Sequence, residues 1–148
     1  MLVKEIMTPS MDAVAPDRTL QEAARRMRDI NIGSLPVWEK GEMLGMITDR
    51  DICCRAVAEG RDPARTTVRE VMSREVASCF SDDDIADAAQ LMERNHIRRL
   101  AVLNHDRTMA GFLSVDDLAH YSHQLAGYVL DAARATHRET RAQSYFSA

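Results

Sequence analysis

Two stretches of the sequence share one pattern, namely Gly45-Met46-Ile47-Thr48-Asp49-Arg50-Asp51 and Gly111-Phe112-Leu113-Ser114-Val115-Asp116-Asp117. In each, a glycine precedes a hydroxyl side chain by three residues and an aspartate by six. Apolar residues before the hydroxyl are typical of a strand, and the polar residues after it are typical of the first turn of a helix. The pattern therefore predicts a strand-to-helix corner that occurs twice.

The repetition extends outward from these corners. An earlier pair of matching stretches is Val3-Lys4-Glu5-Ile6-Met7-Thr8 and Val68-Arg69-Glu70-Val71-Met72-Ser73, at a spacing of 65 residues that becomes 66 after one inserted residue. A register kept over some 50 positions indicates an internal repeat. We expect one repeat over residues 1–62, a second over 63–122, and a C-terminal helix with a polar tail over 123–148.

Each repeat predicts the same order of elements. Thr19 and Glu22 have the spacing of a capping box, and Leu20, Ala23, Ala24 and Met27 then share a helix face with the mates Ile85, Ala88, Ala89 and Met92. Apolar runs flank turns at 39–42 and 104–107 and predict hairpins, and a second helix follows to Gly60. We therefore expect the fold class α+β, with two βαββα units packed sheet to sheet about a pseudo-two-fold axis.

The corners carry groups that suit a nucleotide. A hydroxyl at a helix N-terminus lies where free N–H groups favour an anion, and an aspartate one turn later can accept both hydroxyls of a ribose. Each corner alone also fits an ordinary N-cap with a first-turn acid. Recurrence in register inside the repeat favours the ligand interpretation.

The stretch from Val3 to about Leu118, four-fifths of the chain, resembles a tandem pair of CBS domains, also called a Bateman module. The resemblance rests on the stretches 3–8, 17–24, 32–37 and 45–51 and on 68–73, 97–102 and 111–117. Ala101 departs from it, because the family usually has proline there, which should affect packing more than binding.

The resemblance implies adenosine ligands in clefts between the units: AMP, ADP or ATP, with S-adenosylmethionine or NAD less favoured. Asp51 and Asp117 would hold ribose hydroxyls, Thr48 and Ser114 would lie near ribose or phosphate, and Thr8 and Ser73 would stand at the entrance. Arg98 and Arg99 would meet phosphate, and Val14, Val37 and Val102 would surround adenine.

The two repeats differ where charge matters. The first has Gly33-Ser34 where the second has Arg98-Arg99. Only the latter can neutralise a phosphate, unless Arg50 serves the first cleft, so we expect unequal clefts. The alternative for Arg98 and Arg99 is a solvated strand end or an ion pair with Glu93 or Asp106.

Composition excludes several other classes. A net charge of −4 argues against a nucleic-acid binder, and no apolar stretch approaches a membrane span of about 20 residues. Three cysteines and the lack of a leader favour the cytoplasm, with Cys53 and Cys54 as small core fillers. No histidine or cysteine set has zinc spacing, and no catalytic motif is evident, so we expect neither a metal site nor an enzyme.

The leading hypothesis is a regulatory module that changes shape on binding an adenosine nucleotide and signals to a protein effector. The alternative is a ligand-independent homodimerisation scaffold. An apolar periodicity in Tyr121, Leu125, Tyr128, Val129 and Ala132 predicts a helix, and the polar segment after Arg134 predicts fraying. This helix would pack on its own domain, seal a homodimer or dock the effector.

Overall fold

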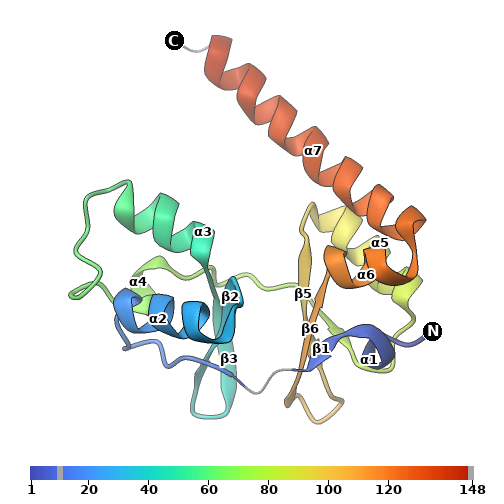
Figure 1. Cartoon of the computed structure of the whole chain (residues 1–148), viewed down its shortest axis with the longest axis horizontal. Helices are drawn as coiled ribbons and strands as arrows, with labels where there is room; N and C mark the ends of the chain where they lie inside the picture. The colour runs from blue at the N-terminus through green and yellow to red at the C-terminus, as the bar shows by residue number, and fades with distance from the viewer. Residues whose placement is uncertain (10–11, 147–148) are drawn as a thin grey trace. The chain divides into compact units, whose positions relative to one another are not determined.

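A computed structural model describes residues 1–9 and 12–146, with side chains described through residue 135. The chain forms two compact units. One consists of Asp12–Val76 and is named here the Asp51 unit; the other joins Met1–Met11 to Ala77–Ala148 and is named the Asp117 unit. Figure 1 labels most of the elements of both units.

The Asp51 unit is built around a hairpin. Its elements are α2 (Leu20–Ile30), β2 (Ser34–Glu39), β3 (Glu42–Thr48), α3 (Asp49–Asp51), the π-helical η1 (Ile52–Val57) and α4 (Val68–Val71). Strands β2 and β3 are antiparallel, and Lys40 and Gly41 at the turn have φ of 51° and 78°. Positive φ at both central residues of a two-residue loop matches the twist of the flanking strands. The predicted hairpin is confirmed.

Single bridges widen this hairpin on both sides. Val14 pairs in parallel with Val37 on β2, and Ser73 pairs in antiparallel fashion with Met46 on β3. The predicted capping box is present as well, since Thr19 Oγ1 accepts from Glu22 N–H at 3.2 Å. The helix face that it starts buries Leu20, Ala23 and Met27 and half-buries Ala24.

The Asp117 unit repeats this plan in a four-stranded sheet, where the Asp51 unit has a two-stranded one. Its elements are α1 (Val3–Ile6), β1 (Thr8–Pro9), β4 (Ser78–Phe80), α5 (Ile85–Asn95), β5 (Arg99–Leu103), β6 (Met109–Ser114), α6 (Val115–Tyr121) and α7 (His123–Phe146). The sheet order is β1-β6-β5-β4, with β4 parallel to β5 and the other pairs antiparallel. The α+β fold class with a C-terminal helix is confirmed.

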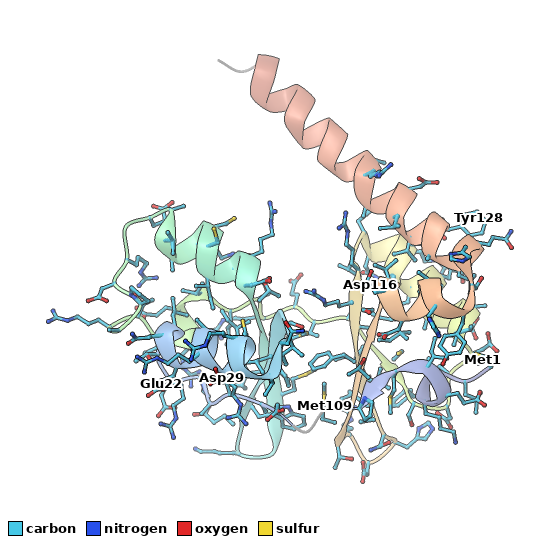
Figure 2. All side chains as sticks on the ribbon, viewed as in Figure 1. Met1, Glu22, Asp29, Met109, Asp116 and Tyr128 are labelled. Atoms are coloured by element: carbon cyan, nitrogen blue, oxygen red, sulfur yellow. The ribbon has the colours of Figure 1, made fainter. Side chains whose placement is uncertain are left out.

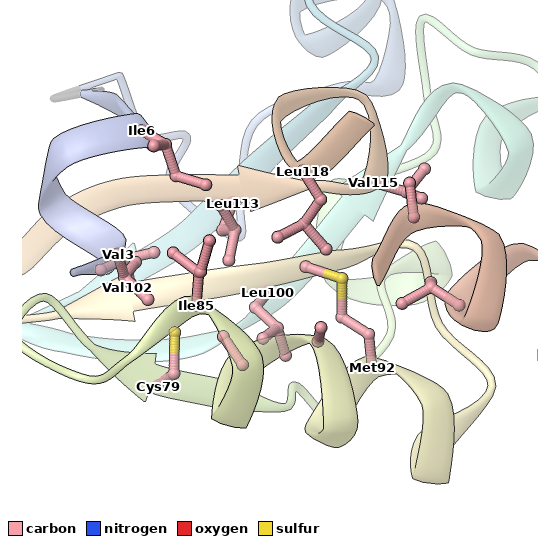
Figure 3. Close-up of a cluster of buried hydrophobic side chains, with 14 residues drawn as sticks. Val3, Ile6, Cys79, Ile85, Met92, Leu100, Val102, Leu113, Val115 and Leu118 are labelled. Atoms are coloured by element: carbon pink, nitrogen blue, oxygen red, sulfur yellow. The ribbon is translucent and has the colours of Figure 1, made fainter. Parts of the chain in front are cut away.

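Each unit encloses its own apolar core. In the Asp117 unit the α5 face predicted from the repeat is wholly buried and packs on Leu100, Leu113 and Leu118, which are 0% exposed (Figure 3). In the Asp51 unit the corresponding core contains Leu20, Leu35 and Ile47, also 0% exposed. Burial of these side chains is the main stabilising contribution to each unit.

The two repeats exchange their first segments in space. Thr8, from the start of the first repeat, pairs with Phe112 of the second repeat. Ser73, from the start of the second repeat, pairs with Met46 of the first. The expected boundaries at residues 62 and 122 describe the sequence repeat and stay a prediction, while the compact units combine segments from both repeats.

Helix α7 is longer than its polar composition predicts. It buries Ala126, Val129 and Ala133 and packs on α5 and α6, so its first part does pack on its own unit. The backbone stays helical through Phe146, beyond the fraying expected after Arg134. The end of the predicted tail, 147–148, lies outside the described residues.

The outer side of this helical region carries aromatic side chains. Tyr121 and Tyr128 are 50% and 51% exposed, and Figure 2 labels Tyr128 on α7. Among the described residues, no helix is both long and apolar enough to cross a bilayer.

Candidate functional site

The first candidate corner lies at the end of β3 in the Asp51 unit. Thr48 Oγ1 accepts from Asp51 N–H and Asp51 Oδ2 accepts from Thr48 N–H, both at 3.0 Å. These reciprocal bonds satisfy donors that the start of a helix leaves free. They also fix the carboxylate, which belongs to a residue only 8% exposed.

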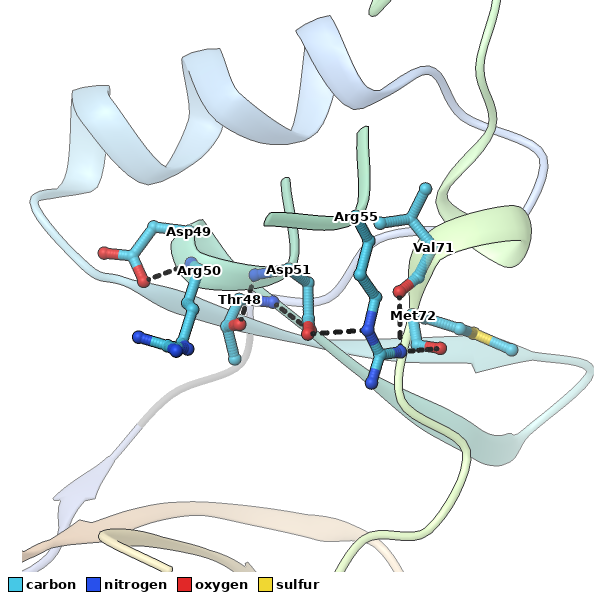
Figure 4. A network of polar contacts seen from close by, with 7 residues as sticks. All are labelled: Thr48, Asp49, Arg50, Asp51, Arg55, Val71 and Met72. Atoms are coloured by element: carbon cyan, nitrogen blue, oxygen red, sulfur yellow. Dashed lines mark hydrogen bonds and ion pairs between the residues drawn. The ribbon is translucent and has the colours of Figure 1, made fainter. Parts of the chain in front are cut away.

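The other carboxylate oxygen of Asp51 faces a cation. Arg55 Nε lies 3.8 Å from Asp51 Oδ1, and Arg55 Nη1 donates to the carbonyl oxygens of Val71 at 3.2 Å and Met72 at 3.5 Å (Figure 4). The sequence interpretation overlooked Arg55. Its spacing of four residues from Asp51 on a predicted helix was the available signal.

The second corner lies at the end of β6 in the Asp117 unit. Ser114 N–H and Ser114 Oγ both donate to Asp117 Oδ2 at 2.8 Å, and Asp117 N–H donates to Ser114 Oγ at 3.2 Å. Thr8 Oγ1 donates to Asp117 Oδ1 at 3.4 Å. In each corner Oδ1 is the outward oxygen, the one not bonded to the cap residue. In Asp117 it accepts a long bond from a neutral hydroxyl, whereas in Asp51 it lies near a guanidinium.

The strand before each hairpin begins beside its corner. Ser34 is paired across the sheet with Thr48, and Arg99 with Ser114. The N–H group that opens each helix donates at 2.9 Å to the carbonyl of the residue before that strand, from Asp49 to Gly33 and from Val115 to Arg98. The structure therefore brings Arg99 alongside Ser114, at the place that Ser34 takes in the other unit.

The cationic residues of these corners are accessible. Arg98 and Arg99 are exposed, and among the described side chains neither forms an ion pair with Glu93 or Asp106. Arg50 is also exposed, and its side chain extends away from the contact between Asp51 and Arg55 (Figure 4). Both arginines are exposed at the beginning of β5, and their contact with a phosphate stays a prediction.

The two glycines of the pattern serve a close backbone approach. A Cβ atom on Gly45 would collide with the carbonyl oxygen of Ser73, and one on Gly111 would collide with that of Thr8. Ser73 is half-buried and exchanges main-chain hydrogen bonds with Met46 at 2.8 and 2.9 Å. The glycines therefore hold the exchanged segments against the strands that lead into the corners.

The three valines expected around adenine lie inside the units. Val37 and Val102 are 0% exposed and belong to the apolar cores, and Val14 is 6% exposed. Val14 also lines a hollow of about 320 Å³ together with Ala13, Ala15, Arg18, Glu22 and Arg26. The structure therefore offers the surroundings of Val14, more than the side chains of Val37 and Val102, to a ligand.

The cysteines differ from the sequence expectation. Cys53 and Cys54 are exposed, so their prediction as core fillers is wrong. The turn that carries them directs Ala56, 1% exposed, and the half-buried Ile52 inward, which places Cys53 and Cys54 on the outer side.

Cys79 is buried, and desolvation raises the pKa of its thiol to about 12. Among the described residues, no group of three histidine, cysteine or acidic side chains is arranged to hold a metal ion.

Three kinds of comparison relate this chain to known proteins: a family profile, related sequences and solved structures. The profile of the CBS domain matches residues 3–56 and 68–124, one match in each repeat. The CBS domain-containing protein YhcV of Bacillus subtilis is 42% identical over 130 residues, which cover 86% of this chain and 91% of that protein.

Solved structures agree with the fold. The conserved CBS domain protein TA0289 of Thermoplasma acidophilum aligns with a TM-score of 0.81 at 26% identity, covering 90% of this chain and 76% of that one. The CBS domain pair of protein MJ0100, solved in complex with 5′-methylthioadenosine and S-adenosyl-L-methionine, aligns with a TM-score of 0.71 at 27% identity, covering 81% and 94%. With both repeats matched over most of its length, the chain belongs to the CBS domain family as a tandem pair of CBS domains.

Proposed function

We propose that this chain is a regulatory module that binds an adenosine nucleotide such as AMP, ADP or ATP and changes conformation in response. The observation that carries the proposal is the corner formed by Ser114 and Asp117. Its hydroxyl and carboxylate are fixed by bonds of 2.8 Å, and its outward oxygen is engaged only by a 3.4 Å bond from Thr8 among the contacts described. Such an oxygen can exchange a weak partner for a ribose hydroxyl.

Two further observations support the nucleotide class. Exposed Arg99 is paired in the sheet with Ser114, which puts a cation at the same end of the strands as the proposed ribose carboxylate. The CBS pair of MJ0100 was solved with two adenosine compounds, which makes an adenosine moiety the shared chemistry to test first. We assign the module a regulatory role without catalysis, acting on a protein effector as a homodimer.

One observation favours a different function. Both Asp51 and Asp117 complete capping boxes, and that role alone would account for their position. In that case the chain would be a ligand-independent dimerisation scaffold, with exposed Tyr121 and Tyr128 available at its surface.

A thermal-shift panel separates the two functions. A ligand at about 100 times its Kd adds about 2.7 kcal/mol to the free energy of unfolding, which for a chain of this size raises Tm by about 5–10 °C. AMP, ADP, ATP, S-adenosylmethionine and NAD are each tested at millimolar concentration. No rise in Tm with any of them would favour the scaffold.

The residue assignment needs a matched pair of variants. Asp117→Asn should weaken binding of AMP at least tenfold, because a hydrogen bond to a charged acceptor contributes about 1.5–3 kcal/mol. Asp116 is the exposed neighbour of Asp117 (labelled in Figure 2). Asp116→Asn removes the same charge there, and this variant should bind AMP as the unaltered protein does. Equal affinity of the unaltered protein for AMP and 2′-deoxy-AMP would refute the ribose role.

A further inference from the structure

Within the Asp51 unit, Arg55 lies beside the carboxylate oxygen that would accept a hydrogen bond from a ribose hydroxyl. Asp51 Oδ2 is committed to Thr48 N–H at 3.0 Å, so Oδ1 is the oxygen left to face a ligand. Arg55 Nε lies 3.8 Å from that oxygen. The side chain of Asp51 is 11% exposed and that of Arg55 is 55% exposed, so the pair joins a largely buried anion to a cation that reaches it from the surface.

The guanidinium is anchored on a second side. Arg55 Nη1 donates to the carbonyl oxygens of Val71 and Met72, which follow one another at the end of α4 (Figure 4). Carbonyl groups at a helix end have no intrahelical partner, and Arg55 supplies a donor to these two. The arginine is thus held in place by main-chain acceptors whether or not Asp51 is paired, and this lowers the entropic cost of keeping it beside the carboxylate.

The Asp117 unit has no such cation at the matching position. The repeat spacing of 66 residues that pairs Asp51 with Asp117 also pairs Arg55 with Tyr121. Tyr121 is 50% exposed, and the outward oxygen of Asp117 accepts from Thr8 instead. One corner therefore presents its carboxylate with a neutral partner, while the other presents it already paired with a cation.

We infer that Arg55 determines the selectivity of the Asp51 corner by competing with the ribose for Asp51, so that adenosine must displace the guanidinium to bind there. This inference rests on the proposed function. It assigns the lower affinity to the Asp51 corner through a contact inside that corner, in addition to the absence of arginines at Gly33 and Ser34.

The test uses the full chain with the other corner disabled by Asp117→Asn. The probe is adenosine itself, because a ligand without phosphate gains nothing from the positive charge of Arg55. In this background we expect Arg55→Met to bind adenosine about three- to tenfold more tightly by isothermal titration calorimetry, since a partly exposed ion pair opposes binding only modestly. Raising the NaCl concentration should tighten binding when Arg55 is present and leave it unchanged in Arg55→Met.

Two further variants control for folding and for charge. Arg55→Gln keeps a donor for the carbonyls of Val71 and Met72 but removes the charge, and it should show the same gain if Arg55→Met folds poorly. Arg65→Met removes one positive charge from the same unit at a side chain that is 89% exposed, and its adenosine affinity should not change.

The outcomes separate this inference from the function on which it rests. Unchanged or weaker adenosine binding in both Arg55 variants overturns the inference and leaves nucleotide binding intact. Weaker AMP binding with unchanged adenosine binding would also overturn it, by identifying Arg55 as a phosphate contact. If neither the unaltered chain nor any variant binds adenosine or AMP, the proposed function fails and the inference fails with it.

Discussion

The Asp51 and Asp117 corners have the same backbone and different electrostatics. In both, a hydroxyl residue caps a helix, the aspartate three residues later returns a bond to the cap, and a glycine admits an exchanged segment. The outward oxygen of Asp51 faces Arg55 at 3.8 Å, whereas that of Asp117 faces the Thr8 hydroxyl at 3.4 Å. The two corners thus share their geometry and differ in the charge beside the aspartate.

The strand beside each corner reinforces this difference. Ser34, 6% exposed, stands opposite Thr48, and the exposed Arg99 stands opposite Ser114. The cation therefore lies beside the carboxylate in the Asp51 unit, where it is Arg55, and near the cap hydroxyl in the Asp117 unit, where it is Arg99. A cation on the carboxylate opposes a ribose, whereas a cation near the cap can attract a phosphate.

The largest change expected in this comparison comes from the two glycines. Gly45→Ala and Gly111→Ala should each lower the free energy of unfolding by about 1–3 kcal/mol, because the new methyl group meets main-chain atoms that cannot rotate away. Urea denaturation at pH 7 measures the effect.

Gly127→Ala is the matched control for the glycine variants. A Cβ atom there meets no heavy atom within 4 Å, and Gly127 lies within α7. Alanine should therefore leave stability unchanged or raise it by up to about 1 kcal/mol. If Gly45→Ala or Gly111→Ala behaved like Gly127→Ala, the close approach of the exchanged segments would be refuted.

Substitution of the two N-cap residues, Thr48 and Ser114, tests a smaller difference between the two corners. Thr48→Ala and Ser114→Ala should each cost about 1 kcal/mol of unfolding free energy through loss of the N-cap acceptor. Ser114→Ala should cost more, because Ser114 Oγ also donates to Asp117 Oδ2 at 2.8 Å. Thr48→Ser and Ser114→Thr keep the hydroxyl and should lie near the unaltered protein in the same urea titration; equal losses in the two alanine variants would remove this distinction between the corners.

The sequence predicted the elements of both corners and left out their partners. The capping box at Thr19, the hairpins and the buried α5 face followed from local spacing, because each depends on residues only a few positions apart. The contacts of Asp117 with Thr8 and of Gly45 with Ser73 join segments far apart in the chain, and the repeat pattern alone does not say that these segments are exchanged.

Two other outcomes have equally specific causes. Cys53 and Cys54 were assigned to the core from their residue type, whereas helix phase decides which face they occupy. The family resemblance places Val37 and Val102 around adenine; their strands direct both side chains into the apolar cores, and their contact with adenine stays a prediction. Residue type predicts burial well only when the facing of the element is already known.

The smallest effect concerns the segments beside the two hairpins. In the Asp117 unit His105 Nε2 lies 2.8 Å from Asp82 Oδ2 and its ring stacks on Phe80, whereas the Asp51 unit joins Glu39 to Arg69 at 3.2 Å. The hydrogen bond from His105 is the main cause that lowers the pKa of Asp82. This contact therefore stabilises the fold above the ordinary aspartate pKa of about 3.9, and the stabilisation disappears as the pH falls through the lower pKa of the folded state.

Asp82→Asn isolates that contribution. It should lower Tm slightly at pH 7 and reduce the further drop in Tm between pH 7 and pH 3, because the asparagine has no proton to gain. Its repeat mate Asp17 is exposed and supplies the control, so Asp17→Asn should keep the acid sensitivity of the unaltered protein. If Asp82→Asn and Asp17→Asn lost stability in parallel as the pH fell, the two hairpins would not differ in acid response, and the contrast between the units would be confined to the corners themselves.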